Sequence, residues 1–162
     1  MRLAFAAAAS LLAFVVPAEA QPQQSAAASP ANALAPAARQ PAAVVDSFHA
    51  ALKRGDTRAA LRLLAEDALI FEAGGVERGK AEYASHHLAA DAAFSQAVPS
   101  TITRRAGEAA GNIAWIATEG RTTGTYKGKA VDRRTVETIV LRRTAAGWKI
   151  AHIHWSSAAG GK

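Results

Sequence analysis

The sequence predicts an α+β domain in which N-terminal helices pack on an antiparallel sheet. Between residues 44 and 97, apolar residues recur every three or four positions, which is the spacing of an amphipathic helix. After Pro99 the period changes to two, which is the spacing of a strand with one buried face. Helices first and a run of strands last are typical of the α+β class.

Three helices are expected. The first covers residues 44–54 and ends at Gly55, and Asp56 is suited to cap a short second helix. A longer third helix is predicted over residues 79–97, with Glu82 in its positively polarised first turn. The first two helices are expected to form a hairpin.

Strands are expected before and after the third helix. Glycine-bearing turns, among them Gly74-Gly75, Gly107 and Lys127-Gly128, separate them. The predicted strands are residues 68–72, 76–78, 100–106, 112–126, 130–144 and 148–156.

The two central strands carry apolar residues on both faces. In the strand at 112–126, Ile113 and Trp115 alternate with Ala114 and Ile116. Only one face can lie on the helices, so another apolar surface must cover the other. A second copy of the same sheet would do so, and we predict a homodimer formed through the sheet face.

The N-terminus has the layout of a secretory signal. A positive start and a short apolar run lead to small residues around Ala20, so we predict a signal peptide at residues 1–20 and a periplasmic or secreted protein. Residues 21–42, rich in alanine, proline and glutamine, are predicted to be a disordered linker. The folded domain is expected at 43–157, followed by a disordered tail at 158–162. No later segment is apolar enough to span a membrane.

Composition excludes several functional classes. The 162 residues include no cysteine, which rules out disulfides, thiolate metal sites and cysteine nucleophiles. The formal net charge is +6, but the basic residues of the second half fall as pairs at predicted strand ends. This pattern differs from a basic recognition helix, and we predict no nucleic-acid partner.

Two segments give the sequence a family resemblance. The segment from Phe48 to Asp56, FHAALKRGD, and the closing GWKIAHIHWS from Gly147 to Ser156 resemble the nuclear transport factor 2-like superfamily, in its SnoaL-like and ketosteroid-isomerase-like bacterial branches. The closing segment is also similar to the association domain of calcium/calmodulin-dependent kinase II. The resemblance covers about residues 44–157 and implies a cone-shaped, cystatin-like fold with a pocket at its open end. Its members include isomerases, cyclases, dehydratases and domains without catalytic activity.

The resemblance implies, for isomerases, a pocket carboxylate that moves a proton and a donor that stabilises an enolate oxygen. The residues of that motif are not found at matching positions. From its own residues the chain offers His87 and Tyr83 on one face of the third helix, with Glu119 as a base and Arg121 as an anion clamp on a central strand. The alternative for the last two is a cross-strand ion pair. Glu72 is expected at the pocket mouth.

Further polar and aromatic residues complete the candidate binding set. We expect His86 beside His87, His152 and His154 on one face of the last strand, and Trp115 and Trp155 at a cavity or an interface. Histidines packed within a structural interface are the alternative interpretation. No cofactor or metal ligand is assigned, although four imidazoles with Glu72 or Glu82 would also suit a divalent transition metal.

The sequence therefore favours an exported, dimeric protein that binds a small apolar or weakly anionic organic ligand, with acid–base chemistry in its pocket. Two other functions remain open at this point. One is a non-catalytic binding or assembly module, and the other is a histidine-rich metal-binding protein.

Overall fold

The computed structural model describes residues 32–161. The predicted signal peptide and linker residues 21–31 lie outside this range. The described chain forms four α-helices and seven strands. A short 3-10 helix (Pro36–Ala38) lies directly before the first α-helix. The helices are α1 (Arg39–Lys53), α2 (Thr57–Leu63), α3 (Lys80–His86) and α4 (Leu88–Ala97). The strands are β1 (Asn32–Leu34), β2 (Leu64–Glu72), β3 (Gly75–Arg78), β4 (Ser100–Ala110), β5 (Ile113–Tyr126), β6 (Lys129–Thr144) and β7 (Gly147–Ala159).

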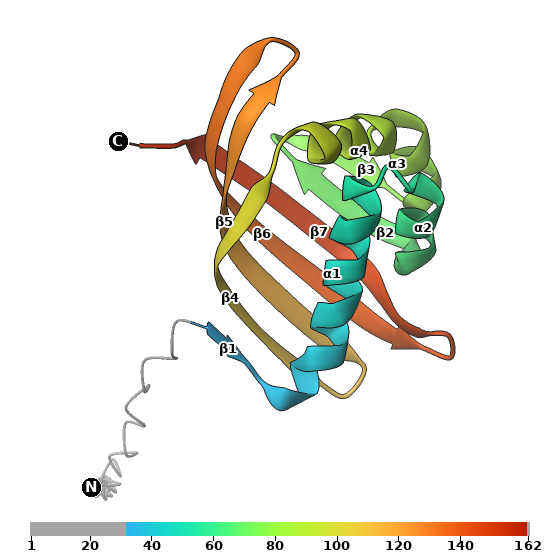
Figure 1. The fold of residues 1–162 in the computed structure, drawn as a ribbon. Coiled ribbons are helices and arrows are strands. Elements are labelled where there is room, and N and C mark those ends of the chain that lie inside the picture. The colour runs from blue at the N-terminus through green and yellow to red at the C-terminus, as the bar shows by residue number, and fades with distance from the viewer. Residues whose placement is uncertain (1–31, 162) are drawn as a thin grey trace, which may run out of the picture.

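All seven strands belong to one curved sheet. Their order is β1-β4-β5-β6-β7-β2-β3, in which β1 runs parallel to β4 and β2 runs parallel to β7, while the other neighbours are antiparallel. Helix α1 crosses one face of the sheet, and α2, α3 and α4 gather at one end of it (Figure 1). The predicted α+β class, with helices on an antiparallel sheet, is confirmed.

The core lies between α1 and the covered face of the sheet. Val45, Phe48 and Leu52 face inward from α1, where they are almost fully buried. Ile116 and Ile139 meet them from β5 and β6. Gly55, with φ +72°, adopts the left-handed conformation that ends a helix, and the Asp56 carboxylate accepts the Ala59 N–H at 2.9 Å to start α2. The predicted helix end and cap are therefore confirmed.

The ordered domain begins earlier than the sequence predicts. Helix α1 starts at Arg39 rather than at residue 44, and β1 precedes it. Ala38 and Ala42 are buried in the core, because small side chains fit where α1 approaches the sheet closely. Residues 32–42 therefore belong to the fold and not to a linker. An alanine-rich composition hides this role because it gives no strong periodicity.

The predicted long helix at 79–97 is two helices. The chain departs from helical geometry at His87, whose φ is −112°, between α3 and α4. The Asp91 N–H still donates to the His87 carbonyl at 3.0 Å, so the two helices follow each other closely. No glycine or proline marks this break, and the sequence therefore gives no sign of it.

Two strands continue past their predicted ends. Gly107 lies inside β4, paired with Ile116, and not in a turn. Glycine suits this position because a Cβ there would come within 2.8 Å of the Trp115 carbonyl oxygen. Strand β7 reaches Ala159, where it pairs with Arg133 of β6, so the predicted tail at 158–162 is ordered in its first residues.

Within residues 32–161, no helix has both the length and the apolar character needed to cross a bilayer.

Candidate functional site

A cavity of about 130 Å³ opens between the β2–β3 hairpin and the helices α3 and α4. The hairpin contributes Ile70, Glu72 and Glu77, and Trp155 of β7 forms another wall. The helices contribute Tyr83, His87 and Asp91. Polar and titratable groups thus meet apolar walls in one hollow, which is the usual composition of a small-molecule site.

Tyr83, His87 and Asp91 reach this cavity because they follow one another at intervals of four residues. This spacing keeps side chains on one helix face, and the break at His87 leaves the alignment intact. Tyr83 is fully buried, and its hydroxyl donates a hydrogen bond to Asp91 Oδ2 at 2.7 Å. The pair links the middle of α3 to the first turn of α4.

Two carboxyl groups of the cavity, those of Asp91 and Glu72, have raised pKa values. Burial is the main cause at Asp91, and the nearby Glu77 adds to it, although the Tyr83 hydrogen bond and the His87 charge oppose the rise in pKa. Partial burial and the Asp91 charge raise the pKa of Glu72. Burial also raises the pKa of Tyr83, so its phenol stays protonated. A carboxylate of raised pKa beside a neutral phenol is suited to accept a proton.

His87 is oriented by a buried carboxylate. Its Nδ1 contacts Glu77 Oε1, while His86 Nδ1 lies 3.3 Å from the other oxygen of the same carboxylate. The Glu77 side chain is only 7% exposed. The hydrogen bond and the charge of Glu77 raise the pKa of His87, which favours the imidazolium near neutral pH. The contact occupies Nδ1 and leaves Nε2 as the other titratable nitrogen.

The lining of the cavity is acidic. Glu72, Glu77 and Asp91 contribute carboxylates, and no lysine or arginine is among the described residues that line it. These three carboxylates outnumber the single His87 imidazolium, so the lining disfavours an anionic ligand more than a neutral or cationic one. The weakly anionic ligand that the sequence analysis expects therefore does not suit this lining.

Trp155 is held in place by a second buried carboxylate. Its indole Nε1 donates to Glu137 Oε2 at 2.7 Å, and its ring stacks on Phe48 with centroids 6.4 Å apart. His49 Nε2 contacts the same Glu137 oxygen at 2.8 Å. Residues in the core thus fix the orientation of a cavity wall.

Several predicted site residues meet in the cavity. Tyr83, His87, Glu72 and Trp155 line it, and His86 lies beside His87 on Glu77. Glu77 and Asp91 are the titratable cavity residues that the sequence analysis does not include. Asp91 stands four positions after His87, so the helical spacing gave a signal for it. Glu77 gave none, because a charged residue in a short strand is usually exposed.

Glu119 and Arg121 do not line the cavity. Both alternate with the buried Thr122 and Ile116 and therefore lie on the opposite face of β5. Glu119 lies 3.8 Å from Arg104 Nε, and Arg121 makes two hydrogen bonds to Asp132, at 2.8 and 2.7 Å. These are cross-strand ion pairs, as the alternative interpretation expects. Glu119 is therefore not a base of this cavity, and Arg121 is not its anion clamp, because the register of β5 turns both side chains away from the helices.

The strand histidines and Trp115 also lie away from the cavity. His152 Nδ1 donates to the Leu69 carbonyl at 2.8 Å, and the rings of His152 and His154 both contact Phe71 edge-on. Trp115 is 38% exposed on the same face of β5 as Glu119. The expected meeting of His87 with a strand histidine does not occur, since His152 and His154 alternate with the buried Ile153 on β7.

The comparisons with known proteins identify the family. The model of the SnoaL-like domain matches residues 42–160. A candidate ketosteroid isomerase from Shewanella frigidimarina is 39% identical, and the match covers 76% of this chain and 100% of that one with a TM-score of 0.72. None of the curated proteins compared with the chain matches it.

Two more distant structures support the fold. A nuclear transport factor 2-like protein with a cystatin-like fold from Novosphingobium aromaticivorans is 17% identical over 77% of this chain and 84% of its own, with a TM-score of 0.64. A candidate calcium/calmodulin-dependent kinase II association domain from Xanthomonas campestris is 24% identical over 75% and 87%, with a TM-score of 0.63. With a family model that spans most of the chain and a solved relative matched along its whole length, this protein belongs to the SnoaL-like domain family of the nuclear transport factor 2-like superfamily.

Proposed function

We propose that this protein binds a small neutral or cationic organic molecule in the cavity between α3, α4 and the β2–β3 hairpin, and transfers protons to and from it. The observation that carries the proposal is the pairing of Tyr83 with Asp91 in a hollow that His87 also lines. A candidate isomerase among the similar structures supports this class of chemistry.

Asp91 is the proposed base and His87 the proposed acid. Burial keeps the pKa of Asp91 above its ordinary value, which strengthens its carboxylate as a proton acceptor, and the Tyr83 hydroxyl fixes its orientation. His87, held as an imidazolium by Glu77, can donate a hydrogen bond to an oxygen on which negative charge develops. This division of roles suits abstraction of a proton next to a carbonyl group.

The size of the cavity limits the ligand. Its volume of about 130 Å³ lies below the range of pockets that hold drug-sized ligands. Pockets for drug-sized ligands occupy about 300–1,000 Å³. The proposed substrate is therefore a small carbonyl compound, and a four-ring steroid exceeds the space between the hairpin and the helices.

Deuterium exchange into cyclohexanone tests this proposal. The protein is expected to accelerate exchange of the protons next to the carbonyl in D₂O, measured by proton NMR. His87→Gln and Tyr83→Phe are expected to lower the rate by about 10²–10⁴-fold, the usual contribution of general acid–base catalysis. The matched control is Glu119→Gln, on the opposite sheet face, which is expected to retain the full rate. A wild-type rate no higher than that of the two cavity variants would contradict the proposal.

We also propose that the protein is a homodimer whose copies meet through the exposed sheet face. This face carries Trp115, Ile113 and Val136, of which Val136 is 53% exposed. Two ion pairs on this face, Arg104 with Glu119 and Arg121 with Asp132, form within the chain, so these four charges are already compensated when a second copy approaches. The similar association domain shows that the fold occurs in a domain named for assembly.

Replacing Trp115 by arginine is expected to convert the dimer to a monomer, because a buried guanidinium on each copy would lack a partner. Sedimentation velocity measures the change. Ala89→Arg, an exposed change on α4, is the matched control and is expected to leave the dimer intact. A wild-type protein that sediments as a monomer at high micromolar concentration would exclude this interface.

A further inference from the structure

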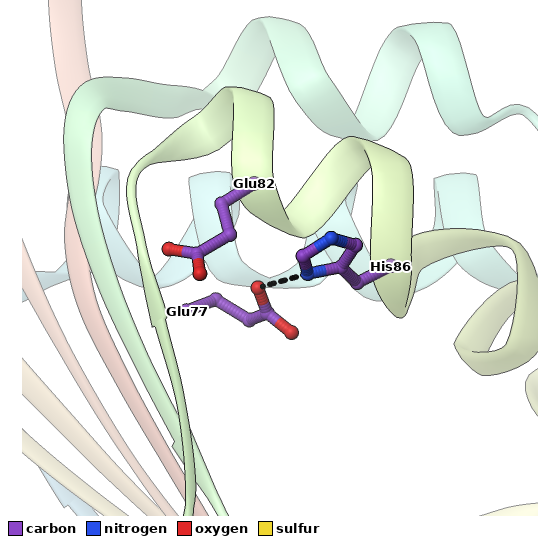
Figure 2. A group of neighbouring side chains, drawn as sticks. All are labelled: Glu77, Glu82 and His86. Carbon is purple, nitrogen blue, oxygen red and sulfur yellow. Dashed lines mark hydrogen bonds and ion pairs between the residues drawn. The ribbon is translucent and has the colours of Figure 1, made fainter.

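A second group of possible ligands adjoins the cavity and shares Glu77 with it. Glu82 and His86 stand four positions apart on α3 and so share one face of the helix. Glu77 approaches them from β3, and the two carboxylates and the imidazole converge (Figure 2). One ligand atom from each residue lies within 4.8 Å of the others.

The distance between Glu77 and His86 suits a shared metal better than a hydrogen bond. Glu77 Oε2 and His86 Nδ1 are 3.3 Å apart. Charge-assisted hydrogen bonds between nitrogen and oxygen are about 2.7–2.9 Å long. Two ligands of a tetrahedral zinc ion, each about 2.0–2.2 Å from the metal, stand roughly 3.3–3.5 Å apart. The separation therefore matches that of two metal ligands.

The charge of the cluster also favours a cation. Glu77 is a nearly buried carboxylate, and within residues 32–161 its recorded ion pairs are with His86 and His87 only. The His87 imidazolium compensates one carboxylate of the Glu77 and Glu82 pair, and a metal ion would compensate the second. Glu82 adds a second negative charge, and its Oε2 accepts the Arg78 N–H, which leaves Oε1 available and fixes the side chain.

The geometry points to a binding site for a divalent first-row transition ion formed by Glu77, Glu82 and His86. One imidazole nitrogen with two carboxylate oxygens is a donor set that zinc accepts, with water as a fourth ligand. This site differs from the one that the sequence analysis considered, because His152 and His154 take no part. It uses Glu77 Oε2 and leaves Oε1 to His87, so it does not depend on the proposed proton transfer.

Calorimetric titration of the purified protein with Zn²⁺ tests the site. We expect uptake of one ion per chain, and we expect Glu82→Gln and His86→Gln each to weaken affinity at least tenfold. Glutamine at 82 can still accept the Arg78 N–H, so helix α3 is expected to remain folded. His154→Gln and Glu108→Gln, exposed on β7 and β4, are the matched controls and are expected to bind as the wild type does.

Replacement of zinc by Co²⁺ gives an independent readout. Tetrahedral coordination is expected to produce intense visible absorption bands that Glu82→Gln abolishes. Absence of zinc uptake, uptake that neither α3 variant weakens, or an equal loss in the His154→Gln control would each overturn the assignment. The cyclohexanone exchange assay contains no added metal, so its result and that of the titration are distinguishable.

Discussion

Asp91→Asn is expected to lower proton transfer to cyclohexanone by about 10²–10⁴-fold while making the protein more stable at neutral pH. The loss of activity follows from the removal of the proposed base. The gain in stability follows from burial, which raises the pKa of Asp91 in the folded state and so penalises its charged form. An amide of the same shape carries no charge and can still accept the Tyr83 hydrogen bond.

The raised pKa of Asp91 also determines how the free energy of unfolding changes with pH. Because the folded pKa lies above the ordinary value of 3.8, the charged carboxylate destabilises the fold as the pH rises through this window. The free energy of unfolding of Asp91→Asn is expected to exceed that of the wild type by about 0.5–2 kcal/mol at pH 7. The difference is expected to vanish below the unfolded pKa, where the aspartate is protonated in both states. Denaturant unfolding across this pH range measures it.

Asp67→Asn is the matched control. The hydrogen bond from Arg142 holds the pKa of this exposed carboxyl below its ordinary value, so the substitution is expected to give no stabilisation. A loss of stability in Asp91→Asn at pH 7 would show that the hydrogen bond contributes more than the buried charge costs. Unchanged exchange activity in the same variant would remove Asp91 from the mechanism.

Deprotonation of His87 is expected to set the upper pH limit of the exchange activity. Glu77 raises the pKa of His87 above 6.5, so the proposed acid is present below that raised value and is lost as the pH rises through it. The rate of exchange is therefore expected to rise with ionisation of Asp91 and to fall with deprotonation of His87. In His87→Gln the fall at high pH is expected to disappear, because glutamine does not titrate.

The fold was more predictable from the sequence than the site was. The change of apolar period at Pro99, the helix end at Gly55 and the cap at Asp56 are local signals, and the structure retains each of them. The early start of α1 and the break at His87 depend on tertiary packing of small or polar residues. Such packing leaves little trace in the local periodicity.

The cavity residues illustrate the same limit. Tyr83 and His87 could be identified because four-residue spacing places them on one helix face. Glu119 and Arg121 were assigned to the wrong face of β5 because alternation defines two sets of side chains without showing which set is covered. Glu77 could not be found, since its burial depends on how the short strand β3 packs beneath α3.

Glu137→Ala is expected to disturb the cavity from within the core. The substitution leaves the Trp155 indole N–H without its acceptor and removes the contact to His49. An unsatisfied buried donor costs about 1–3 kcal/mol, and we expect a loss of this size in the free energy of unfolding. The intrinsic fluorescence, to which Trp115 and Trp148 also contribute, is expected to shift as the Trp155 indole changes its environment.

The Glu137 carboxylate is stabilising despite its burial. Burial alone would raise its pKa, but hydrogen bonds from His49 and Trp155 and the charges of His49 and Arg105 together outweigh that effect and lower it. The stability it contributes is therefore present above the ordinary value of 4.5 and is lost as the pH falls through the lower folded value. Glu137→Gln, which keeps an acceptor for Trp155, is expected to unfold with less dependence on pH below 4.5 and to retain the wild-type fluorescence.

Comparison of the two variants separates positioning of the cavity wall from stability alone. Because only Glu137→Ala frees the indole, cyclohexanone exchange is expected to fall in Glu137→Ala and to persist in Glu137→Gln, even where both proteins are fully folded. Glu108→Ala, an exposed glutamate on β4, is the matched control and is expected to change neither property. Equal loss of exchange in both Glu137 variants would mean that the charge of the carboxylate, rather than its hold on Trp155, matters to the cavity.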